Sequence, residues 1–273
     1  MAGFFCFSTE GVWGGVITQL AEVMNGARRK VKRASSHIRN LEADAANLPS
    51  ELYEVSLFES RSKILLLHPD IFDLKFVPKA DVSLHFAAII GDAFNNLREA
   101  LDYWMNAAMQ TVGPKRKVHF PFSAEHDKLK EGKTFKDIEK WFPEAASFID
   151  QQVKPSRDTN ENLWAVTDFS NLNKHNEFVP TAALAMITNI NAVTGGNQFT
   201  DCGVGGSANQ QIGMMRSDVP IQFGPDYKAS VNLTFAVGTV FDGKEVIKQI
   251  GDVFSTVSST LDTLEAFIKP YCA

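Results

Sequence analysis

A group of closely spaced polar residues interrupts an apolar run in the stretch GDAFNNLREALDYW, residues 91–104. An arginine here can hold a phosphate or carboxylate through two parallel hydrogen bonds, and asparagine amides can read the edge of a base or sugar. At about 100° per residue, a helix would gather these polar residues on one side and the apolar residues on the other. Any amphipathic helix has a solvent-exposed polar face, whether or not that face has a function. The residue composition of the face must therefore show whether it is a binding site.

Two features of this face favour a cleft over open water. Gly91 inside a helix costs about 1 kcal/mol relative to alanine, which indicates that something packs close to the backbone. The face carries amides and carboxylates but no lysine, whereas solvated helix surfaces are rich in long charged side chains. The expected ligand-binding residues, completed by the end of a later helix, are Asp92, Asn95, Asn96, Arg98, Asp102, Tyr103, Lys174 and His175.

Apolar periodicity predicts the helices that would position this face. The helix with the polar face is expected to begin after the N-cap residue Asp81 and to run to about Gln110. An earlier helix has an apolar stripe from Val16 to Ala45 and ends before Pro49. Further helices are predicted around residues 133–142, from about 159, and over 246–268 after an Asp242 cap.

Short segments rich in aromatic and branched residues predict small antiparallel sheet regions. The Gly, Asn and Gln-rich stretch 189–211 matches no phosphate-binding loop, and we expect a connecting loop or a strand edge there. The fold class is therefore α+β, with long amphipathic helices packed against small sheets. We expect one domain over 1–273, or a division into 1–177 and 178–273. The predicted strands lie at residues 51–58, 62–67, 71–77, 179–188, 212–223 and 229–241.

Composition limits the partners and the compartment. A net charge of −5 argues against a protein that grips nucleic acid through its overall field, although local basic patches such as residues 28–33 remain possible. The three cysteines fit no disulfide or zinc framework, and no run of about 20 uncharged apolar residues occurs. We expect a cytoplasmic protein without a membrane partner or cofactor. His119 and His126 lack a third ligand at suitable spacing, so no metal site is predicted.

Three segments together resemble a family of uncharacterised bacterial and phage-associated proteins. GDAFNNLREALDYWMNAAM, FPF and LWAVTDFSNLNKH are similar to its landmarks: GD with His-Asn-Leu-Arg-x-Ala-Leu-Asp-His, then FP, then a helix closing in Asn-x-x-Lys-His. The resemblance spans about residues 80–180. The family motif is in turn similar to the Arg-x-x-x-x-His signature of HEPN ribonucleases, which are helical domains that often pair.

The resemblance places Arg98 at the position of the nuclease cation, which would stabilise a charged phosphorane. The motif histidine is replaced by Tyr103, and the earlier family histidine by Asn95. Tyrosine is a poor general base at neutral pH and asparagine transfers no proton, so this chain departs from the nuclease pattern where proton transfer is needed.

Three hypotheses of function follow. The first is a non-catalytic module that binds a polar or nucleotide-like small molecule in a cleft on the 91–106 helix. The second is a HEPN-like, metal-independent ribonuclease in which His175 or His119 substitutes as the base beside Arg98. The third is a structural or interaction protein without a small-molecule site.

The length of the first helix predicts an assembly. Its apolar stripe is longer than a domain of this size needs to cover its own core, so part of it is expected to meet another surface. We expect a homodimer through residues near Val16 to Ala34. The competing expectation is that the closing helix covers this stripe within one chain.

Overall fold

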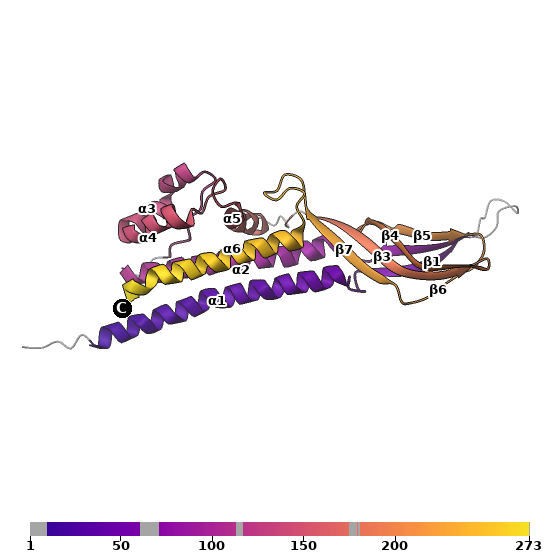
Figure 1. Cartoon of the computed structure of the whole chain (residues 1–273), viewed down its shortest axis with the longest axis horizontal. Coiled ribbons are helices and arrows are strands. Elements are labelled where there is room, and N and C mark those ends of the chain that lie inside the picture. The colour runs from indigo at the N-terminus through magenta and orange to yellow at the C-terminus, as the bar shows by residue number, and fades with distance from the viewer. Residues whose placement is uncertain (1–9, 61–70, 113–116, 175–178, 180, 273) are drawn as a thin grey trace, which may run out of the picture. The chain divides into compact units, whose positions relative to one another are not determined.

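The computed structural model describes residues 10–60, 71–112, 117–174, 179 and 181–272, without the side chains of 10–23, 60, 173, 174 and 272. Its order of helices and antiparallel strands is an α+β fold, as predicted (Figure 1). The longer helices are α1 (Glu10–Ala46), α2 (Val82–Val112), α5 (Glu161–Lys174) and α6 (Val246–Ile268). The short helices are η1 (His126–Glu131), α3 (Lys133–Trp141), α4 (Pro143–Phe148), the π-helical turn η2 (Ile149–Val153) and η3 (Lys269–Cys272).

The chain divides into two compact units whose boundaries cut across α1, α2 and α6. The helical unit consists of the residues up to Ser36, Gly91–Asn176 and the residues from Ile250 onward. The sheet unit consists of His37–Ile90 and Glu177–Gln249. One boundary falls beside residue 177, where the sequence suggested a division, but three helices contribute to both units.

The core of the helical unit is formed by the apolar stripes that periodicity predicts. On α2, Phe94, Leu97 and Trp104 are fully buried, and Phe94 contacts Phe169 of α5 with 4.6 Å between ring centroids. The helix α1 runs beside α2 and α6 (Figure 1). Polar contacts fix this arrangement, because Arg28 pairs with Asp262 and Glu265 of α6, and Lys30 pairs with Glu99 of α2.

These contacts bear on the predicted dimer. Ala27, Val31 and Ala34 of α1 are already buried within one chain, at 0%, 8% and 0% exposure. The described part of the proposed interface is thus covered, in keeping with the competing expectation. The homodimer remains a prediction that depends on residues 16–23, whose side chains are outside the described ones.

Among the described residues, every helix is too short or too polar to span a membrane.

The sheet unit contains two small sheets. One has the strand order β1-β2-β5, from β1 (Tyr53–Ser60), β2 (Ile71–Pro78) and β5 (Ile212–Ser217). In the other, β3 (Thr181–Thr194) pairs with β4 (Asn197–Ser207) on one side and with β6 (Ile221–Phe223) and β7 (Lys228–Phe235) on the other. All these pairings are antiparallel. The predicted strand 62–67 lies outside the described residues.

The Gly-rich stretch 189–211 forms most of a β-hairpin, so of its two expected forms the strand edge is confirmed and the connecting loop is wrong. It includes the end of β3 and all of β4, and β4 pairs only with β3 among the described strands, as a strand at a sheet edge does. Gly195 and Gly196 have φ values of 55° and 79° between the paired residues Thr194 and Asn197. Two consecutive positive φ values are the requirement of a two-residue type I′ turn, which glycine meets without strain.

The predicted helix caps differ in outcome. The prediction for Asp81 is confirmed, since its Oδ1 accepts a hydrogen bond from the backbone N–H of Leu84 at 2.9 Å. The prediction for Asp242 is wrong, because its carboxylate accepts from the N–H of Gly238 within the turn that precedes α6. The helix begins only at Val246, so Asp242 lies too far upstream to cap it.

A substitution in the hairpin turn tests the conformational role of its glycines. Gly196→Ala should lower the free energy of unfolding by about 1 kcal/mol, because an L residue is strained at this φ although nothing lies within 4 Å of the added Cβ. The matched control is Gly213→Ala in β5, where the added Cβ also meets nothing within 4 Å and φ is ordinary. Urea unfolding of both variants decides, and equal losses would contradict the turn assignment.

Candidate functional site

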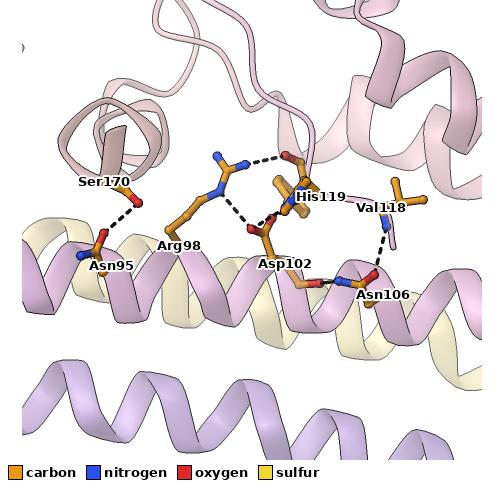
Figure 2. A network of polar contacts seen from close by, with 8 residues as sticks. Asn95, Arg98, Asp102, Asn106, Val118, His119 and Ser170 are labelled. Carbon is orange, nitrogen blue, oxygen red and sulfur yellow. Dashed lines mark hydrogen bonds and ion pairs between the residues drawn. The ribbon is translucent and has the colours of Figure 1, made fainter. Parts of the chain in front are cut away.

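The polar face of α2 is covered by a neighbouring segment of the chain. Arg98, Asp102 and Asn106 follow one another at four-residue intervals, which places them in one row along the helix. The segment 117–122, which follows the helix after a short break, lies against this row (Figure 2). The three side chains and this segment form what we call the Arg98 cluster.

Asp102 is the centre of the Arg98 cluster. Its Oδ1 accepts a hydrogen bond from the backbone N–H of Phe120 at 2.7 Å. Its Oδ2 lies 3.0 Å from Nδ1 of His119 and accepts a longer bond from Nε of Arg98 at 3.4 Å. Only 16% of the Asp102 side chain is exposed, so these donors replace the water that the carboxylate has lost.

Asn106 extends the same pattern by one helical turn. Its Oδ1 accepts from the N–H of Val118 at 3.0 Å, while its Nδ2 donates to the carbonyl of Asp102 at 2.7 Å. Alternate N–H groups of the extended segment, those of Val118 and Phe120, are thus held by side chains four residues apart on α2 (Figure 2). This fixes the position of the residue between them, His119.

Arg98 is held on three sides. Its Nε points to Asp102, its Nη2 donates to the carbonyl of Phe120 at 3.3 Å, and its Cζ lies 4.4 Å from the ring centroid of Phe122. The side chain is 13% exposed, and burial lowers the pKa of the guanidinium while Asp102 opposes that shift. The remaining nitrogen, Nη1, is buried and has no hydrogen-bond partner among the residues that the structure describes.

His119 is the exposed member of the Arg98 cluster. Its side chain is 70% exposed, and its Nδ1 makes the contact with Asp102. A neutral imidazole that donates from Nδ1 to a carboxylate presents Nε2 as an acceptor. The cluster therefore offers one imidazole nitrogen to solvent beside a buried guanidinium.

Only part of the predicted site comes together in this cluster. Arg98 and Asp102 belong to it, and Asn95 lies one turn away, where its Oδ1 accepts a hydrogen bond from Ser170 of α5 at 2.9 Å (Figure 2). Lys174 ends α5, but its side chain and all of His175 lie outside the described residues. Whether these two complete the site stays a prediction.

The other predicted residues lie outside the Arg98 cluster, so their role in binding stays a prediction. Asp92 is exposed, and Asn96 donates to its carbonyl within the helix at 2.8 Å. Tyr103 turns toward α1, where a Cβ on Gly26 would lie 3.0 Å from its ring. The physical reason is that the polar arc is wide, so its two edges face different neighbours.

Sequence reasoning underrated His119 and missed the roles of Asn106, Phe122 and Ser170. The usable signal was the four-residue spacing of Arg98, Asp102 and Asn106, followed at once by the segment that they hold. The described residues contain no group of three His, Cys, Asp or Glu side chains that could bind a metal. His126, considered with His119 as a possible ligand, instead lies 3.5 Å from Asp150 through its Nε2.

Replacing the central carboxylate should loosen the Arg98 cluster. Asp102→Asn should lower the free energy of unfolding by about 1–3 kcal/mol, because the amide puts an NH₂ group against donors that need an acceptor. The matched control Asp92→Asn removes an exposed carboxylate from the same helix and should change the free energy of unfolding by less than about 0.5 kcal/mol. Both values come from denaturant unfolding, and similar losses would show that Asp102 is not the anchor.

Comparison with known proteins gives no information on function, which must therefore be inferred from the geometry of the site. No family model, curated protein or solved structure matches the chain. The similarity to HEPN ribonucleases therefore remains an expectation based on the motif residues around Arg98.

Proposed function

We propose that the helical unit is a non-catalytic binding module that takes a polar, phosphate-bearing small molecule at the Arg98 cluster. The observation that carries this proposal is that the buried Nη1 of Arg98 has no hydrogen-bond partner in the described part of the chain. A buried donor on a charged group costs more without an acceptor than a neutral one, so an anionic oxygen at this position would stabilise the protein. A nucleotide is one ligand with such oxygens.

The rest of the cluster supplies secondary contacts for this ligand. His119 offers an exposed ring nitrogen, and the Nδ2 of Asn95 makes no hydrogen bond with a described residue, since its contact with Ser170 uses Oδ1. Asn96 is already bonded to its own helix, so we assign it no contact with the ligand. Since Nη1 is buried, an anion reaches it only when residues around Arg98 move, and binding should perturb the surroundings of this side chain.

Thermal shift with defined phosphate compounds tests the proposal. Inorganic pyrophosphate and the nucleoside 5′-monophosphates should raise the melting temperature of the full chain, because a ligand that binds only the native state stabilises it. Arg98→Met removes the guanidinium that lies over the Phe122 ring but keeps an unbranched apolar side chain, and should abolish the shift. The control Arg33→Met removes an exposed guanidinium of α1 that makes no hydrogen bond or ion pair with a described residue, and this variant should keep the shift.

A second variant separates binding from folding. His119→Ala removes one exposed donor of Asp102 but leaves the Phe120 amide and Arg98 in place, so it should lower the melting temperature without ligand by less than Asp102→Asn does, while weakening the ligand-induced shift. No shift of the wild-type protein with any of these compounds, or an equal shift in Arg98→Met, would refute the binding module.

The contact between His119 and Asp102 favours a second candidate, a metal-independent ribonuclease. A carboxylate on Nδ1 orients the imidazole and leaves Nε2 to accept a proton, which is the arrangement of a general base. In this reaction Nε2 would take the proton of a ribose 2′-hydroxyl, whose oxygen attacks phosphorus. The bond to the 5′-oxygen breaks, and this oxygen takes a proton from water, leaving a 2′,3′-cyclic phosphate and a 5′-hydroxyl. Arg98, which contacts the same carboxylate as His119, would be the cation that balances the developing charge.

Incubation of the protein with a mixed RNA pool and a chelator decides this second candidate. Cleavage to 2′,3′-cyclic ends is expected, with a loss of roughly 100-fold in His119→Ala because general-base catalysis contributes on that order. The variant Asp92→Asn should cleave like the wild-type protein. RNA that stays intact over hours would remove the nuclease and leave the binding module standing.

A further inference from the structure

The helical unit contains a cavity that lies outside the Arg98 cluster. It has a volume of about 580 Å³ and lies open to solvent between the α4–η2 segment and the end of α6. This volume falls within the usual range of small-molecule sites. The lining residues that matter are Glu144, Ser147, Phe148, Gln151, Gln152 and Phe267.

Aromatic rings form one wall of this cavity. Phe148 and Phe267 stack with ring centroids 4.4 Å apart and an angle of 24° between their planes. Phe267 is backed by Tyr271 at 5.3 Å and by the buried Phe142 at 5.9 Å. The aromatic wall is therefore fixed from behind, and a planar ring could stack on it without first ordering a mobile side chain.

The polar wall is built by an unusual turn. The backbone N–H of Lys154 donates to the carbonyl of Ile149 at 2.8 Å, and Lys154 has a φ of 49°. Such π-helical turns cost stability and occur often at functional sites. This turn puts the consecutive residues Gln151 and Gln152 on the same cavity wall.

The polar groups around this cavity are free to bind a ligand. Glu144, Ser147, Gln151 and Gln152 are exposed and make no hydrogen bond or ion pair within the described part of the chain. Glu144 is the only charged residue among the described residues that line the cavity. A ligand that suits these groups is planar, uncharged and carries both donors and acceptors on its rim, as nucleobases do.

We propose that this cavity binds a guanine base. The ring stacks on the Phe148–Phe267 wall, and the two oxygens of the Glu144 carboxylate accept the adjacent N1–H and N2–H donors that the Watson–Crick edge of guanine presents. The glutamine amides supply a donor for O6. A carboxylate repels phosphate, so the sugar and phosphate of a nucleotide would extend away from Glu144 toward solvent.

Calorimetric titration of the full chain with free nucleosides tests this proposal without any phosphate. Guanosine should bind with one site per chain, and inosine, which lacks the N2 amino group, should bind roughly tenfold more weakly because one hydrogen bond to a charged group is lost. Adenosine presents no such pair of donors and should bind more weakly than inosine. Glu144→Gln should weaken guanosine binding by roughly tenfold, and Phe148→Leu should weaken it by a similar factor through lost stacking.

Matched controls show whether guanosine binds at this cavity or elsewhere on the chain. Glu139→Gln changes an exposed carboxylate of α3 that does not line the cavity and should bind guanosine like the wild-type protein. Arg98→Met should also retain guanosine binding, so failure here and failure of the binding module are distinguishable. If 1 mM guanosine does not bind to the wild-type protein, the proposal is overturned. Equal affinities for adenosine and guanosine, or tighter binding of tetramethylammonium to the aromatic wall, would overturn it too.

Discussion

The arrangement around α2 depends on one carboxylate, that of Asp102, which accepts hydrogen bonds from a backbone amide, an imidazole and a guanidinium. A carboxylate that is mostly withdrawn from water is tolerated only when donors surround it. The segment 117–122 brings two of these donors. Its path across α2 is therefore fixed by the hydrogen bonds that Asp102 needs. The burial of Arg98 beside Phe122 follows, since the same segment closes over it.

The helices were predictable because their signal is local. Every apolar residue of the α2 stripe that periodicity selects between Phe86 and Ala108 is buried, and the helix begins after its predicted cap. The cluster was only half predictable. Two of the partners of Asp102, in the segment 117–122, lie 17 and 18 residues away in the sequence, and Asn95 bonds Ser170 across 75 residues. The spacing along one helix therefore identifies the polar residues but not their partners on other segments.

The hairpin of β3 and β4 shows the opposite limit. Glycine has a low strand propensity, so a stretch with Gly203, Gly205 and Gly206 indicates a loop when it is considered alone. In the structure the strand exists because β3 supplies a partner for eight of its residues. At Gly205 the lack of a side chain also has a use, because a Cβ there would lie 2.6 Å from Sδ of Met186 on the neighbouring strand. Hydrogen-bond pairing and side-chain packing with β3 make this segment a strand. The propensity of its own residues gives no information about that pairing.

The interleaving of the two compact units has a consequence for how the chain is made. On the ribosome, every segment of the sheet unit has been synthesised once Gln249 emerges, whereas the helical unit still lacks the segment from Ile250 onward. Until then the stripe that contains Ala27 and Val31 waits without the helix that carries Asp262 and Glu265. Early intermediates therefore expose apolar helix surface, a condition in which chaperone holding is useful. Neither unit is a continuous stretch of polypeptide, so evolution could not have exchanged one of them by simple end-to-end gene fusion.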